Sequence, residues 1–192
     1  MRTSRRVLTV ALVCMSSFAA AQQSDQVVAE RVLGPQWQQL SRRAGMIFAG
    51  TVLTAPPSTA ATARTVPAAT PAVQLSFRVD QAIAGVERGQ ILTIHEWVGA
   101  WSMHRTMSKG QHILIFLYPP SRLGLTSPVG GALGQVALDP SGKNVSQNAQ
   151  TPAAVMGLRN AASPPSRVPI DTGSVSVVQL ERAIRSARNE EE

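Results

Sequence analysis

The sequence predicts a mainly β domain, built as a small barrel of five to six short strands with a helix toward each end. Apolar and polar residues alternate over residues 73–79, which is typical of a strand with one buried face. Other short runs of β-branched and aromatic residues are separated by turn residues, and helical spacing of apolar residues appears near the two ends. Strands do not alternate with long helices, so a closed or nearly closed barrel is expected and not a βαβ fold.

Residues 1–21 have the features of a signal peptide. A basic start with three arginines is followed by an apolar run over residues 7–13, and three alanines precede Gln22 as a cleavage site. The only cysteine of the chain, Cys14, lies inside this segment, so a mature chain beginning near Gln22 would have no thiol. We therefore expect an exported protein, periplasmic or extracellular, that is stabilised by its core and not by disulfides.

Charge and hydropathy limit the partners of the mature chain. Loss of the three N-terminal arginines lowers the number of Lys and Arg residues from 18 to 15 and the formal net charge from +7 to +4. The remaining cations are scattered and are not interleaved with aromatic residues, so a nucleic-acid partner is not expected. No later apolar run approaches the roughly 20 residues of a membrane-crossing helix, so no transmembrane span is expected in the mature chain.

The mature chain is predicted to begin with a helical segment over residues 22–43, divided into two short helices at Gly34-Pro35 because proline cannot continue a helix. The barrel is expected over residues 44–146, and its first strand covers residues 45–54. An insertion over residues 55–72 consists almost wholly of Ala, Pro, Thr and Ser. Such a composition cannot bury enough apolar surface to become ordered, so this insertion is expected to be flexible.

Three strands of the barrel follow the insertion. Residues 73–79 place four apolar side chains on one face, and a turn-like connection over residues 81–89 leads to a strand over residues 91–98. The next strand, residues 112–118, is apolar on both faces and is the expected centre of the sheet. It ends before Pro119 because proline lacks the amide donor that a sheet ladder requires.

A glycine-rich loop over residues 124–134 leads into a predicted hairpin of residues 135–138 and 143–146. Its glycines fit either close approach of the backbone to a ligand or the positive φ angles of tight turns. Residues 147–173 are rich in Pro, Ala and Ser and are predicted to form a linker.

The C-terminal segment, residues 174–192, is predicted to contain a helix over residues 177–188. Ser176 and Gln179 have the spacing of a capping box, in which each residue binds the backbone amide of the other. The apolar residues that follow have helical spacing, so one face of this helix is expected to pack on the domain.

Four segments of the predicted barrel resemble netrin-like and TIMP-like domains, which are similar to the OB-fold: AGMIFAGTV at residues 44–52, FRV at residues 77–79, GQHILIFL at residues 110–117 and LTS at residues 125–127. The resemblance covers residues 44–146 and implies an OB-like barrel, here in a cysteine-free, bacterial-type variant. Animal TIMP proteins inhibit proteases through an N-terminal cysteine that chelates the zinc ion of the target. The predicted mature chain has no cysteine, so the resemblance implies the barrel but not this mode of inhibition.

No catalytic motif is found in the sequence, so the chain is not expected to be an enzyme and no cofactor is expected. His95-Glu96 begins like a zinc-protease motif, but Gly99 stands where the second histidine is required. The surrounding residues also have the pattern of a strand, whereas that motif requires a helix. No serine occupies the Gly-x-Ser-x-Gly turn that exposes a nucleophile.

The three histidines, His95, His104 and His112, keep a second interpretation open. If neighbouring strands brought His95 and His112 together, their imidazoles with Glu96 nearby could bind zinc or copper, as in an envelope metal-binding protein or enzyme. Both of these histidines share a strand face with apolar residues. Half-buried histidines with a structural role are therefore the preferred interpretation, and no residue is assigned to a metal site.

The loop that follows the strand ending near residue 98 is the candidate contact with a partner. Its anchor-type side chains are Trp97, Trp101, Met103, His104 and Arg105. The alternative is that the two tryptophans only plug the barrel end against the N-terminal helix. The sequence thus predicts a secreted or periplasmic, non-enzymatic protein-interaction module with an unknown protein partner in the envelope or extracellular space. An accessory protein or an inhibitor of an exported enzyme would fit this description.

Overall fold

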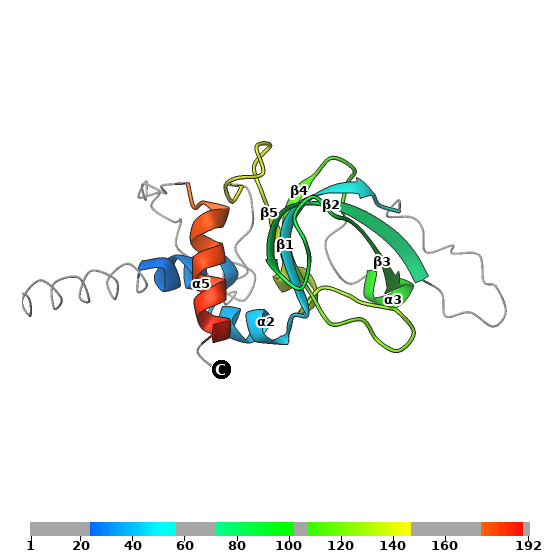
Figure 1. Ribbon diagram of the computed structural model, residues 1–192, viewed down its shortest axis with the longest axis horizontal. Helices are drawn as coiled ribbons and strands as arrows, with labels where there is room; N and C mark the ends of the chain where they lie inside the picture. Colours follow the sequence, from blue (N-terminus) through cyan, green and yellow to red (C-terminus); the bar gives the residue numbers. More distant parts are fainter. Residues whose placement is uncertain (1–23, 57–71, 102–106, 147–173, 190–192) are drawn as a thin grey trace, which may run out of the picture.

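The computed structural model describes residues 24–56, 72–101, 107–146 and 174–189 (Figure 1). Five strands form one antiparallel sheet of order β3-β2-β1-β4-β5, and three helices lie together on one side of it. The elements are a helix over residues 24–33, α2 (Trp37–Arg43), β1 (Met46–Thr54), β2 (Ala72–Ala84), β3 (Ile91–Trp97), α3 (Val98–Trp101), β4 (His112–Leu117), the 3₁₀-helix η2 (Gly131–Gly134), β5 (Gln135–Ala137) and α5 (Val177–Asn189). The predicted signal peptide, the insertion and the linker lie wholly or mainly outside the described residues.

The mainly β architecture is confirmed, but the sheet is not closed into a barrel. Strands β1, β2 and β3 pair in succession and β4 returns to the other side of β1, which is the spatial order of a Greek key. The segment after β4 makes isolated bridges across the open side: Leu125 lies beside His95 of β3, and Pro128 lies beside Leu117 of β4. Proline and the turns around this segment interrupt a regular ladder, so no further long strand forms there.

β1 is the middle strand of the sheet, so the prediction that residues 112–118, which contain β4, form its centre is wrong. β4 is apolar on both faces because it separates two hydrophobic clusters. Its residues Leu114 and Phe116 belong to the first cluster, beneath the helices, whereas Ile113 and Ile115 belong to the second cluster, on the opposite face of the sheet. An apolar run therefore indicated a strand between two cores and not the centre of the sheet.

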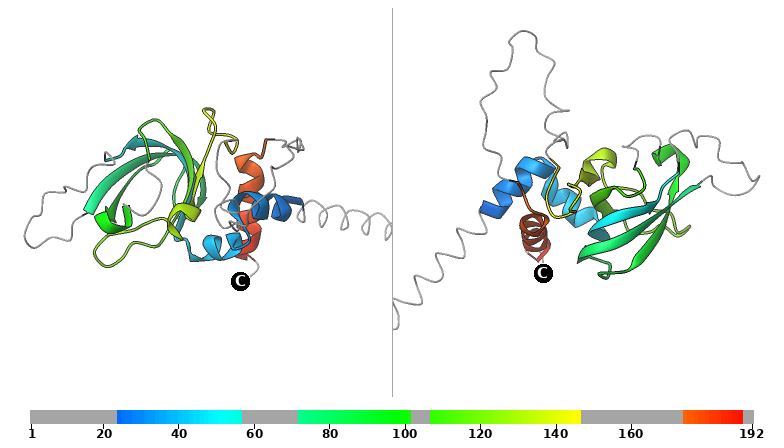
Figure 2. Two further views of the ribbon diagram at one scale, coloured as in Figure 1. Left: turned by 180° about the vertical axis from the view of Figure 1, so that it is seen from behind. Right: turned by 90° about the horizontal axis from the view of Figure 1, so that it is seen from above.

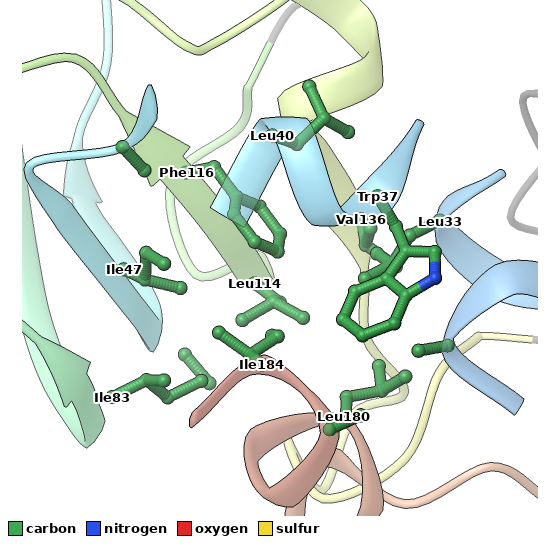
Figure 3. Close-up of a cluster of buried hydrophobic side chains, with 14 of the residues drawn as sticks. Leu33, Trp37, Leu40, Ile47, Ile83, Leu114, Phe116, Val136, Leu180 and Ile184 are labelled. Carbon is green, nitrogen blue, oxygen red and sulfur yellow. The ribbon is translucent and has the colours of Figure 1, made fainter. Parts of the chain in front are cut away.

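The first hydrophobic cluster joins the helices to the sheet (Figure 3). Leu180 and Ile184 of α5 point toward Leu114 of the sheet, and Trp37 of α2 and Leu33 of the preceding helix complete the contact. Leu180, Ile184 and Leu114 are each 0% exposed. The helical spacing of residues 180 and 184 thus turns one face of α5 into the sheet, as the sequence predicts.

Both ends of α5 are held by hydrogen bonds. The predicted capping box is confirmed, because the Ser176 amide donates to the Gln179 side-chain oxygen at 3.1 Å and the Gln179 amide donates to the Ser176 hydroxyl at 3.3 Å. At the other end, Arg188 donates to the carbonyl oxygens of Ser41 and Ala44, the latter at 2.9 Å. These two carbonyls lie at the C-terminal end of α2, so one guanidinium fixes α5 to α2.

β2 is longer than predicted. Residues 81–84 were expected in a turn, but they continue the strand and pair with residues 47–49 of β1. The pairing register shifts twice in this stretch, so the strand contains bulges that disturb the alternation of apolar and polar residues. The sequence period is therefore lost after residue 79 although the strand itself goes on.

Glycines with positive φ angles lie at the predicted helix break and in the predicted glycine-rich loop. Gly34, with φ of 85°, separates the two N-terminal helices, which confirms the predicted break. In the glycine-rich loop, Gly124, Gly130 and Gly131 have φ angles of 72°, 68° and 63°. These values are those of left-handed turn positions, so turn geometry accounts for these three glycines. Gly134, the last residue of the loop, is instead required by space, because a Cβ there would lie 2.4 Å from the Val129 carbonyl oxygen.

Candidate functional site

The five predicted partner-binding residues lie in different environments. Trp97 is the last residue of β3 and is 49% exposed, whereas Trp101, at the end of α3, is only 6% exposed. Trp101 packs in the second hydrophobic cluster, whereas the N-terminal helices belong to the first cluster. Trp101 is therefore a core residue on the face of the sheet opposite those helices. Met103, His104 and Arg105 lie outside the described residues. Of the two predicted residues in the described ranges, Trp97 is the exposed one, and the candidate site is built around it.

The indole of Trp97 is held against the backbone of Gly99. A Cβ atom built on Gly99 would lie 2.3 Å from a ring carbon of Trp97, so the absence of a side chain at residue 99 makes room for the ring. One side of the ring is supported by the chain, and about half of its surface faces solvent. An aromatic side chain that is exposed but already fixed loses little conformational freedom when it binds.

Trp97 belongs to an exposed face of two strands, which we call the β2–β3 face. Its residues alternate with buried ones and are Ala72, Gln74, Ser76 and Arg78 of β2 and Ile91, Thr93, His95 and Trp97 of β3. Ala72 lies beside Trp97 at one end of this face. At the other end Arg78 lies beside Ile91, and polar side chains occupy the positions between the two ends. β3 lies on the side of the sheet away from the helices, which leaves this face uncovered by them (Figure 2).

A polar cluster adjoins the β2–β3 face at Arg78. The Thr51 hydroxyl donates to Asp80 Oδ2 at 2.6 Å, and Arg78 Nε donates to Asp80 Oδ1 at 2.8 Å. Arg78 Nη2 and His112 Nδ1 each lie 3.2 Å from Thr51 Oγ1. Because the single hydroxyl hydrogen of Thr51 points to Asp80, the cluster is not arranged as a nucleophile with a histidine base. It instead anchors the guanidinium of Arg78 at the edge of the face.

The Asp80 carboxylate is kept ionised by its neighbours. Partial burial raises the pKa of Asp80, but the hydrogen bonds from Thr51 and Arg78, with the charges of Arg78 and His112, outweigh burial and leave the pKa below its usual value. This cluster was not predicted from the sequence because its members come from three different strands. The spacing of Arg78 and Asp80 on one face of β2 is the single local signal that indicates part of it.

The histidines are not brought together in the described residues. His95 and His112 lie on β3 and β4, which are separated in the sheet by β2 and β1. Glu96 is 0% exposed and faces the opposite side of β3 from His95, and His104 lies outside the described residues. Within the part of the chain that the structure describes, no group of three or more His, Cys, Asp or Glu side chains could hold a metal ion.

Comparison of the chain with protein-family models, with curated proteins and with solved structures gave no match. Among the helices in the described ranges, none has both the length and the apolar character needed to cross a bilayer.

The candidate site is defined by its own geometry, with a fixed and exposed tryptophan at one end of the β2–β3 face and an anchored arginine at the other.

Proposed function

We propose that this chain is an exported, non-enzymatic protein-interaction module that acts in the periplasm or the extracellular space. In this proposal the β2–β3 face binds a protein partner, and the module serves as an accessory protein or an inhibitor of an exported enzyme. The observation that carries the proposal is Trp97, which is 49% exposed and fixed against Gly99. Tryptophan is among the residues most enriched at the energetic centres of protein interfaces. The signal-peptide pattern of residues 1–21 supports export.

We further propose that the domain is a partly open, OB-like and netrin-like variant. Its five antiparallel strands, four of them in Greek-key order, agree with the general description of an OB-fold as a partly open Greek-key barrel. The bridges of Leu125 to β3 and of Pro128 to β4 run across the open side, where a closed barrel would have a continuous ladder. OB-folds bind their ligands on the face of the second and third strands, which corresponds to the β2–β3 face.

The two ends of the β2–β3 face suit a protein surface better than a small ligand. Ile91 and Trp97 are six residues apart on one strand, a distance of about 20 Å at the usual rise per residue. An apolar anchor at Trp97 and a cationic anchor at Arg78 would therefore contact separate parts of a partner. Two different anchors so far apart fix the orientation of the partner as well as its affinity.

The test is recovery of bound proteins with the full chain, expressed in its host with a C-terminal affinity tag. We expect a specific partner from the envelope or the culture supernatant to be captured by the wild-type chain and lost with Trp97→Ala. Val178→Ala is the matched control, because Val178 is also half exposed, at 55%, but lies on α5 in the helical layer. N-terminal sequencing of the recovered chain tests export, with Gln22 as the expected first residue.

Two results would contradict the proposal. Capture of the same partner by Trp97→Ala at the wild-type level would show that Trp97 does not contribute to the interface. Absence of the chain from both the envelope fraction and the culture supernatant would contradict the proposed export. Trp101→Ala is not a useful test, because Trp101 is a core residue and its truncation would destabilise the fold. Circular dichroism of Trp97→Ala separates loss of binding from loss of structure.

A further inference from the structure

The outer edge of β3 carries backbone groups that point away from the sheet. The Val79 amide of β2 donates to the Gln90 carbonyl oxygen at 2.9 Å, which identifies a hydrogen-bonded pair at the start of the β2–β3 ladder. Such pairs alternate along antiparallel strands, so the backbone groups of residues 92, 94 and 96 are directed to β2. The groups of Ile91 and Thr93 are directed to the opposite side, which is the edge of the sheet.

A contact farther along β3 supports this assignment. The Thr126 amide donates to the His95 carbonyl oxygen at 2.9 Å, and His95 has the same parity in the strand as Ile91 and Thr93. By this alternation the amide and carbonyl groups of Ile91 and Thr93 take no part in the ladder with β2, and within the described ranges they bond to no group outside it. Two donors and two acceptors with the repeat of a strand ladder are therefore open at this edge.

This edge lacks the features that usually protect a sheet from further pairing. Protected edges carry charged side chains, proline or bulges, or they are covered by another element. Residues 91–94 have the sequence Ile-Leu-Thr-Ile, without charge or proline, and their pairing with β2 has no register shift. The Ile91 side chain is 67% exposed. An edge of this composition is a template for another strand.

We propose that residues 91–93 of β3 receive an extended segment of the partner protein, which adds a strand to the sheet. This inference rests on the proposed function and names the form in which the partner binds. An extended polypeptide fits because a second backbone presents donors and acceptors at the same repeat as the open groups. The exposed side chain of Ile91 favours a β-branched or aromatic residue at the position beside it.

Charges at both ends of the edge indicate what flanks that segment. Arg88 is exposed in the hairpin before β3, and Arg122 is exposed in the turn that leads to the bridge with His95. Glu87 is the acidic residue of the same hairpin, so the cations are in excess. Acidic residues on either side of an apolar centre would complement them. A second copy of the chain is disfavoured as the added strand, because it would bring the same arginines together.

The probe for this test is a displayed library of random linear peptides, selected on the full chain. We expect enrichment of peptides with an apolar centre and acidic flanks. Thr93→Pro removes the outward amide without removing a bond to β2, and proline is tolerated at such edge positions. Thr93→Ala also removes the threonine side chain but keeps the backbone amide, so it is the matched control. Enriched peptides should bind Thr93→Ala like the wild type and Thr93→Pro about tenfold more weakly, or worse.

Two further measurements do not depend on the folding of Thr93→Pro. In the wild-type complex, a bound peptide should slow hydrogen exchange at the amides of Ile91 and Thr93. It should leave Leu92 and Ile94 unchanged, because their amides already bond to β2. Peptides that are N-methylated at one residue at a time should lose binding at alternate positions, as expected for one edge of an added strand.

Several outcomes would overturn strand addition. They are the absence of any enriched peptide, equal binding by folded Thr93→Pro and Thr93→Ala, and unchanged exchange at Ile91 and Thr93. A dimer of the chain that Thr93→Pro abolishes would identify a second copy as the occupant and would equally overturn it. Partner capture that depends on Trp97 but not on Thr93 would leave the proposed function in place and remove this inference alone.

Discussion

Replacement of Ile184 by alanine tests whether α5 belongs to the core of the domain. Ile184 is 0% exposed and points from α5 toward Leu114 and Ile47 of the sheet (Figure 3). Ile184→Ala removes three methyl or methylene groups, which at about 0.8 kcal/mol each is a transfer loss of about 2.4 kcal/mol. Incomplete relaxation of the neighbours adds about 1–2 kcal/mol for the cavity. We expect the free energy of unfolding to fall by about 3.5–4.5 kcal/mol.

The measurement is urea denaturation of the full chain, followed by circular dichroism and by tryptophan fluorescence. Val178→Ala is the control on the same helix, because Val178 is 55% exposed and its truncation should change stability by less than about 0.5 kcal/mol. Ile184→Val removes one methylene equivalent and should cost about 1 kcal/mol. If Ile184→Ala cost no more than Val178→Ala, α5 would not be packed on the sheet and the first hydrophobic cluster would be refuted.

Two further predictions concern the sheet. Gly85→Ala should lower the free energy of unfolding by about 1–3 kcal/mol more than Gly89→Ala. Both glycines have positive φ, but a Cβ at Gly85 would lie 2.0 Å from the Gly45 carbonyl oxygen, whereas a Cβ at Gly89 would meet nothing within 4 Å; equal losses in urea would mean that residue 85 is not crowded. Asp80→Asn should reduce the loss of stability in acid, because the folded protein lowers the pKa of Asp80 below its usual 3.8. The stability that the Asp80 carboxylate contributes is fully present above its unfolded pKa and is lost as the pH falls through its folded pKa. If the free energy of unfolding fell equally with acid in the wild type and in Asp80→Asn, the polar cluster would be contradicted.

Local signals were sufficient where an element is specified by neighbouring residues. The capping pair Ser176 and Gln179 marked the start of α5, and Gly34 marked the break between the N-terminal helices. Alternation over residues 73–79 located most of β2 and its buried face. Each of these signals depends on a few successive residues and on no contact far along the chain.

Features that depend on strand pairing were beyond such signals. The last residues of β2 lost their alternation because bulges opposite β1 change the register, and the position of β1 in the middle follows from its pairing with both β2 and β4. The polar cluster likewise needs Thr51 and Asp80 on neighbouring strands.

Of the two tryptophans in the predicted site, Trp97 has an exposure that the sequence pattern indicates, whereas the burial of Trp101 could not be predicted. Trp97 ends a strand with its side chain on the exposed row, which alternation can indicate. Residues 98–101 then form one helical turn where the end of the strand and the start of a loop were expected, and this turn carries Trp101 into the second cluster. A change from strand period to helix period within four residues is too short to recognise from composition.

The two hydrophobic clusters become available at different times during synthesis. The buried members of the second cluster lie between Phe48 and Leu117, so all of them have been made before the last helix. The first cluster needs both the helix over residues 24–33 and α5, which begins at Val177. Until the ribosome has passed residue 189, one apolar side of β1 and β4 has no cover from α5. During this interval the apolar side of the sheet that α5 later covers stays exposed, which is the kind of surface that makes a partly folded chain prone to aggregation.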